Sequence, residues 1–82
     1  MIDLVTAYIM CKIQAGMDDK VVAELKNLEQ IREAALTYGA YDLAIQVNFK
    51  IIEDLDKFLF DTIRRIEGIT ETSTMIVAKQ IV

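Results

Sequence analysis

The sequence predicts a single α+β domain over residues 1–82, of the ferredoxin-like type with the element order βαββαβ. In several segments every second residue is apolar, and between them lie two segments whose apolar residues recur at helical spacing. The pattern also repeats at an offset of 38 residues, which aligns Val5 with Leu43 and Ile31 with Ile69. Two strand-helix-strand units with right-handed crossovers place both helices on one face of a four-stranded antiparallel sheet.

The first unit begins with an expected strand at residues 5–13, where every second residue is apolar and the others are mixed. The apolar positions are Val5, Ala7, Ile9, Cys11 and Ile13. Gly16 supplies a turn, and Asp18 or Asp19 is placed to cap a helix. That helix carries an apolar stripe made of Val21, Val22, Leu25 and Leu28. Residues 31–38 are then expected to form the second strand.

The second unit follows a hairpin at Gly39 and Ala40. Its strand covers residues 43–49, and its apolar positions are Leu43, Ile45, Val47 and Phe49. An amphipathic helix follows, which Gly68 is placed to end. Its apolar stripe consists of Leu55, Phe58, Leu59, Thr62, Ile63 and Ile66. Residues 70–82 are expected to form the last strand.

The second face of this sheet is left without helices, and the sequence places Tyr8 and Met10 on it among polar residues. Such a surface is too apolar to be left in water, so these two residues are predicted to form a dimer interface. A chain this short also buries only about 60 to 65% of its unfolded surface, which makes its own core marginal. We therefore expect an oligomer, with dimers that associate in the manner of a dimeric α+β barrel.

Composition excludes several classes of function. The net charge is −4, and the basic residues are scattered except for Arg64 and Arg65, which disfavours direct binding of nucleic acid. The chain has no histidine, one cysteine, and no nucleotide-binding or metal-ligand motif, so we expect no cofactor, no metal and no enzymatic activity. No membrane segment or targeting signal is visible, which favours a cytoplasmic protein.

Cys11 lies on the uniformly apolar face of the first strand. Without a histidine to activate it, the sequence favours a small buried hydrophobic residue over a nucleophile.

Gly39 and Asp42 have two interpretations. In the first, the glycine takes a positive φ in a hairpin and the aspartate caps a turn amide. In the second, the N–H groups of residues 39–41 receive a carboxylate while Asp42 pairs with an ammonium, which suits the head group of an amino acid. The threonines of residues 70–74 likewise either bind a small polar ligand or follow the β-propensity of threonine.

The strings "TYGAYDLAIQV" and "EGITETSTMIVAK" resemble the two marker stretches of the effector-sensing domain of Lrp/AsnC regulators. The resemblance covers essentially the whole chain and rests on a glycine and an aspartate three residues apart at the hairpin, with a threonine-rich entry into the last strand. Two positions depart from the family pattern: Glu67 replaces a frequent proline and Ile69 replaces valine. Family members carry an N-terminal helix-turn-helix domain, so the chain resembles a stand-alone form without it.

The resemblance implies dimers packed sheet to sheet and assembled further into rings, commonly octamers, with an amino acid or a related metabolite bound between neighbouring dimers. The family's ligand site maps onto Leu36, Gly39, Ala40, Tyr41, Asp42, Ile52, Thr72, Thr74, Met75, Ile76 and Val77. Three functions stay open. They are a ligand-binding oligomeric module, a structural partner that co-assembles with full-length regulators without a ligand, and, least supported, a dimeric ferredoxin-like enzyme.

Overall fold

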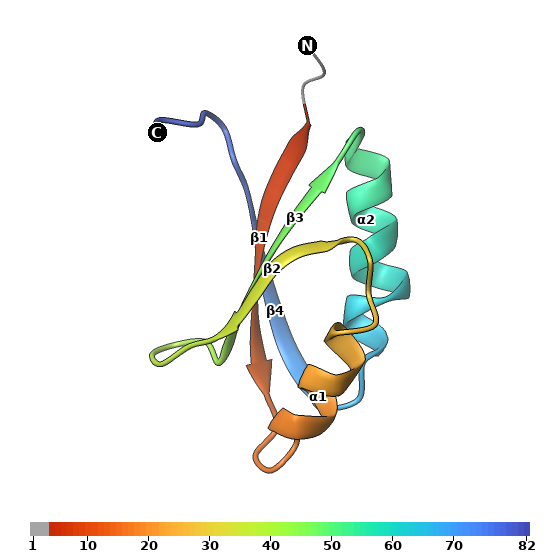
Figure 1. Ribbon diagram of the computed structural model, residues 1–82, viewed down its shortest axis with the longest axis vertical. Helices are drawn as coiled ribbons and strands as arrows, with labels where there is room; N and C mark the ends of the chain where they lie inside the picture. The colour runs from red at the N-terminus through yellow and green to blue at the C-terminus, as the bar shows by residue number, and fades with distance from the viewer. Residues whose placement is uncertain (1–3) are drawn as a thin grey trace.

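The computed structural model describes residues 4–82 and has the predicted element order. The strands are β1 (Val5–Ile13), β2 (Ile31–Leu36), β3 (Leu43–Phe49) and β4 (Ile69–Ile76). The helices are α1 (Asp18–Leu25) and α2 (Ile52–Asp61), and a short 3₁₀ helix, η1 (Ile63–Arg65), follows α2 (Figure 1). The strands form one antiparallel sheet in the order β2-β3-β1-β4. The ferredoxin-like prediction is therefore confirmed.

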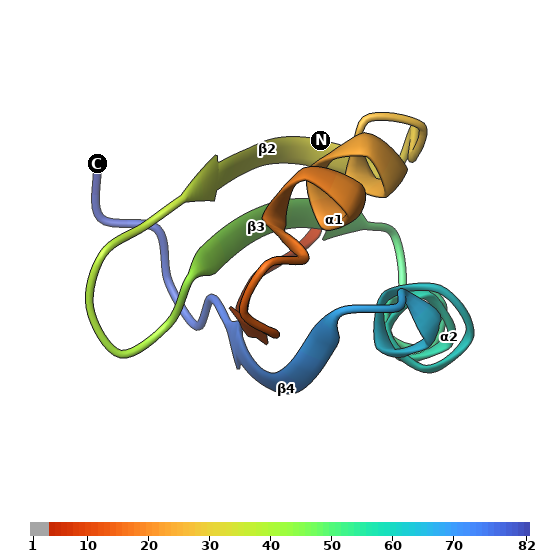
Figure 2. The same ribbon diagram turned by 90° about the horizontal axis from the view of Figure 1, so that it is seen from below.

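Both helices lie on the same side of the sheet, and the β2–β3 hairpin projects towards the other side (Figure 2). The alternation of buried and exposed side chains predicted for β1 is confirmed, because its odd-numbered residues from Ala7 to Ile13 are all buried. Residues of β3, α1, α2 and the segment after α2 complete this core. They are Leu43, Ile45, Val47, Val21, Leu25, Leu55, Phe58, Ile63 and Ile66.

Several element ends differ from the sequence prediction. Asp18 and Asp19 do not cap α1; Met17 holds the cap position, and both aspartates lie in the first turn, where the helix dipole favours them. The second strand ends at Leu36 instead of residue 38, because the chain then enters the hairpin turn. The last strand ends at Ile76 instead of residue 82, because its regular pairing with β1 stops at the Ala7–Ile76 pair.

The internal repeat is visible in the structure. The strands β2 and β4 begin at Ile31 and Ile69, which are 38 residues apart as the sequence predicts. The helices differ more, because α1 has 8 residues whereas α2 has 10 and continues into η1. As a result, α1 covers less of the sheet than its counterpart.

Gly68 connects the turn before β4 to the first unit. Its φ is +103°, a conformation that glycine adopts without steric cost, and its carbonyl accepts a hydrogen bond from the Gln14 N–H at 2.7 Å. A Cβ at this position would lie 2.9 Å from both Met17 Cβ and Val21 Cγ2. The neighbouring Glu67 forms an ion pair with Lys20 of α1, which lowers the pKa of the Glu67 carboxyl through the hydrogen bond and the charge of Lys20. The turn is therefore packed against α1.

Cys11 is completely buried in the core, as predicted. Burial raises the pKa of its thiol to about 11, because the thiolate would lose its hydration. We expect the folded protein to react with Ellman's reagent no faster than it unfolds. The folded state should also lose stability as pH rises from about 9 to about 11, since the unfolded state ionises this thiol first.

Urea denaturation across this pH range tests the expectation, with Cys11→Ala as the control for effects of pH that do not involve this thiol. The variant should lose less stability than the parent between the two pH values. If parent and variant lose equal stability, or if the thiol of the native protein is modified rapidly, the expectation that Cys11 is protected by burial is wrong.

Candidate functional site

The β2–β3 hairpin is closed by Thr37 at the start of the turn, which forms two hydrogen bonds to the residues at its end. Its N–H donates to the Asp42 carbonyl at 2.9 Å, and its hydroxyl donates to the Tyr41 carbonyl at 2.7 Å. Gly39 has a φ of +116°, which confirms the predicted positive φ. In the part of the chain that the structure describes, the N–H groups of Gly39, Ala40 and Tyr41 donate to no protein acceptor. The turn thus presents three consecutive unbonded donors.

Asp42 connects this turn to the end of β1. Its N–H donates to the Cys11 carbonyl at 2.9 Å, and its Oδ2 accepts a hydrogen bond from the Ile13 N–H at 2.8 Å. The regular pairing of β1 with β3 ends at Cys11 and Leu43, so the carboxylate serves as an acceptor where the ladder stops. Among residues 4–82, nothing donates to its other oxygen, Oδ1. Asp42 therefore has a structural bond and one oxygen still free.

The residues mapped from the family's ligand site lie in three places. Leu36 and residues 39–42 are at the β2–β3 end of the sheet, whereas residues 72–77 belong to β4 and the segment after it. Leu36 lies on the edge strand β2, three strand spacings from β4, or roughly 14 Å. Asp42 bonds to Cys11 of β1, which pairs with Thr72, so Asp42 lies about two strand spacings, roughly 10 Å, from that threonine. Ile52 begins α2, at the other end of the sheet from the hairpin (Figure 1). One chain does not gather these residues around one ligand.

The residues of β4 also divide between the two faces of the sheet. Thr72 and Thr74 pair with Cys11 and Ile9, so they share the helix-covered face. Met75 pairs with Tyr8 and lies on the open face. Ile76 is exposed, and the Val77 N–H donates to the Thr6 carbonyl at 2.8 Å. The threonines and Met75 therefore do not face the same ligand within one chain.

The open face carries Tyr8 and Met10, as predicted, between residues of β3 and β4. Tyr8 is 37% exposed and accepts a hydrogen bond from Gln46 Nε2 at 3.3 Å. Met75 beside it is 53% exposed. At one end of the face, Lys12 and Glu71 form an ion pair at 3.3 Å. The face thus has an apolar centre, formed by Tyr8, Met10, Ala44 and Met75, with polar groups around it.

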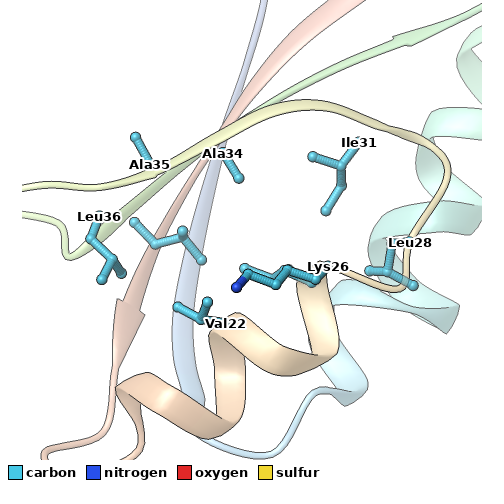
Figure 3. Close-up of a pocket in the computed structure, with 9 residues that line it drawn as sticks. Val22, Lys26, Leu28, Ile31, Ala34, Ala35 and Leu36 are labelled. Atoms are coloured by element: carbon cyan, nitrogen blue, oxygen red, sulfur yellow. The ribbon is translucent and has the colours of Figure 1, made fainter.

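A pocket between α1 and β2 was missed by the sequence prediction. It has a volume of about 270 Å³, and Figure 3 shows Val22 of α1 and Lys26, the residue after α1, facing Ile31, Ala34 and Leu36 across it. The signal in the sequence was the pair of small residues Ala34 and Ala35 in a strand that a short helix must cover. Small side chains opposite a short helix leave space.

Residues 4–82 contain no group of three or more His, Cys, Asp or Glu side chains that could hold a metal ion. Within the same range, no helix has both the length and the apolar character needed to cross a membrane.

The family model described as "Lrp/AsnC ligand binding domain" matches residues 6–82, which is nearly the whole chain. The chain belongs to the Lrp/AsnC family. The HTH-type transcriptional regulator FL11 of Pyrococcus furiosus is 37% identical to it over 75 residues, which are 92% of this chain and 49% of FL11. This Lrp/AsnC chain thus spans about half the length of the curated relatives it matches, and those relatives are named as transcriptional regulators.

Solved structures agree with this assignment. FFRP-DM1 superposes on this Lrp/AsnC domain with a TM-score of 0.84 at 38% identity, covering 89% of this chain and 97% of FFRP-DM1. AsnC of E. coli gives a TM-score of 0.88 at 29% identity, covering 95% of this chain and 53% of AsnC. The ferredoxin-like arrangement is therefore that of the Lrp/AsnC ligand-binding domain.

Proposed function

We propose that this Lrp/AsnC domain binds an amino acid at the β2–β3 hairpin and couples that binding to its own oligomerisation. The observation that supports this most is the combination of three unbonded N–H groups, at Gly39, Ala40 and Tyr41, with the free Oδ1 of Asp42. Consecutive main-chain donors favour a carboxylate. A carboxylate oxygen nearby favours an ammonium. An α-amino acid carries both groups on one carbon atom.

The separation of the mapped residues supports a site made by more than one chain. Two chains that pack through Tyr8 and Met10 would bury their open faces, which is the side towards which the hairpins project. Association of such dimers into a ring, for which we propose an octamer, would bring Thr72, Thr74 and Ile76 of one chain towards the hairpin of another. NMB0573 of Neisseria meningitidis, which has this fold (TM-score 0.87, 20% identity), was solved as a complex with L-Met.

A second candidate is a structural role without a ligand, in which the domain co-assembles with full-length regulators. The bond from the Ile13 N–H to Asp42 Oδ2 favours it, because this bond gives Asp42 a purpose in the fold alone. The two candidates differ in whether an amino acid stabilises the protein.

A thermal-shift screen against the twenty amino acids, followed by calorimetry, tests the proposal. A ligand present at a hundred times its dissociation constant should stabilise the protein by about 2.7 kcal/mol. Asp42→Asn should then lower the affinity for that ligand by roughly tenfold to a hundredfold, because a hydrogen bond to a charged group contributes about 1.5 to 3 kcal/mol. The unliganded variant should lose less than about 1 kcal/mol, since the amide oxygen still accepts from Ile13.

Asp56→Asn, which removes an exposed carboxylate from α2, is the matched control and should bind as the parent does. If Asp42→Asn binds the amino acid normally but unfolds more easily, Asp42 is only a structural acceptor. If no amino acid stabilises the parent, the co-assembly role is favoured instead.

A further inference from the structure

The pocket between α1 and β2 has an apolar wall and a single charged group. Its lining side chains come from α1, the segment after α1, β2 and β3. They are Val22, Leu25, Lys26, Leu28, Ile31, Ala34, Ala35, Leu36 and Leu43. Figure 3 shows Lys26 extending from the end of α1 along the pocket, with its nitrogen directed towards Val22. Ala34 points into the space and Ala35 away from it. Nothing in the proposed hairpin site requires this pocket.

The charge of the pocket determines what it can hold. Both ion pairs found in residues 4–82, Lys12–Glu71 and Lys20–Glu67, leave Lys26 without a carboxylate partner. Of the residues that the structure describes, no acidic one lines the pocket. A ligand with a carboxylate would therefore pair with Lys26, whereas the ammonium of an amino acid would lose water and gain no partner.

The size of the pocket restricts the rest of the ligand. At about 270 Å³ it lies just below the range of pockets that hold drug-sized molecules, about 300 to 1,000 Å³, so it suits a small ligand. The apolar side chains Val22, Leu25 and Leu43 offer contacts to a branched or short hydrocarbon chain.

We propose that this pocket binds a small apolar carboxylate without an amino group, such as a branched-chain fatty acid, as a second ligand site beside the hairpin. The carboxylate pairs with Lys26 at the end of α1, and the hydrocarbon tail packs against Val22, Leu25 and Leu43. Leu36 borders both the pocket and the hairpin, so the two sites are neighbours on the same strand pair.

The test uses four probes of one shape. These are 4-methylpentanoate, leucine (which adds only the 2-amino group), the neutral 4-methylpentanamide, and 3-methylbutylamine. Methyl-group NMR of the intact oligomer, labelled at Ala, Ile, Leu and Val, separates the sites, because Val22 and Ile31 report on the pocket and Ala40 on the hairpin. We expect 4-methylpentanoate to shift Val22 and Ile31 and leave Ala40 unchanged. The amide should bind at least about tenfold more weakly, and the amine should not bind.

Two variants test the assignment further. Lys26→Met keeps the apolar stem and should weaken 4-methylpentanoate by about tenfold or more, whereas Lys50→Met, on the exposed turn before α2, should not. Ala34→Ile should abolish binding by filling the pocket. It places a β-branched residue at an exposed position of β2, where folding tolerates it.

The proposal is overturned if 4-methylpentanoate shifts the methyl signal of Ala40 instead of that of Val22, or if it shifts no methyl signal at millimolar concentration. It is equally overturned if Lys26→Met and Ala34→Ile bind as the parent does. The hairpin site is judged separately, by whether any amino acid shifts Ala40.

Discussion

Gly68→Ala is expected to destabilise the protein by about 2 to 5 kcal/mol, a large part of the 5 to 15 kcal/mol typical of a domain. Two costs combine at this residue. A φ of +103° is unfavourable for alanine by about 1 to 2 kcal/mol, and the added Cβ would lie 2.9 Å from Met17 Cβ and Val21 Cγ2. Such overpacking typically adds about 1 to 3 kcal/mol, because α1 or the turn must move. Chemical denaturation of parent and variant measures the sum.

Gly16→Ala separates the two costs. Gly16 also has a positive φ, +84°, but a Cβ there would meet nothing within 4 Å. It should therefore show only the backbone cost of about 1 to 2 kcal/mol. Equal destabilisation by the two substitutions would mean that the packing of Gly68 against α1 contributes nothing.

Met10→Glu is expected to convert the proposed dimer into monomers of 9.3 kDa, as measured by light scattering. Met10 lies in the apolar centre of the open face, opposite Ala44 on β3 and Ser73 on β4. Packing two such faces would bury the new carboxylate, and the neighbouring cation on this face, Lys12, is already paired with Glu71. Leaving a charge buried and unpaired typically costs about 3 to 5 kcal/mol. Since the helix-covered face is untouched, circular dichroism should show a folded chain.

Lys57→Glu is the control, because it reverses a charge at an exposed position of α2, on the other side of the sheet. It should leave the mass of the oligomer unchanged. If Met10→Glu also keeps the mass of the parent, the chains associate through another surface.

The fold could be predicted from the sequence because its signals are local and periodic. Alternation in β1 identified every residue from Ala7 to Ile13 that is buried. The start of β2 was predicted at Ile31, where it lies, and the last strand was predicted from residue 70, one residue after its start at Ile69. Element ends were predicted less well, because they depend on neighbours. The end of β4 is determined by where its pairing with β1 stops, and no local pattern carries that information.

The candidate site could be predicted only in part, for the same reason. The positive φ of Gly39 follows from glycine at a hairpin, and the structure confirms it. The bond from the Ile13 N–H to Asp42 joins residues 29 apart in the sequence, and only the strand order brings them together. The pocket beside Lys26 is a space that short side chains leave unfilled, so it is evident only once α1 and β2 are placed.

The strand order has a consequence for how the chain folds. In the order β2-β3-β1-β4, the two strands of the first unit are separated by β3, and the two strands of the second are separated by β1. Neither half of the repeat can therefore form a paired sheet by itself. The β1–β4 ladder joins residues as distant as Ala7 and Ile76. Closing such long loops precedes any gain from pairing, so folding is expected to be cooperative and slower than in a helical bundle of this size. A nascent chain still lacking β4 would expose the edge of β1 to other molecules.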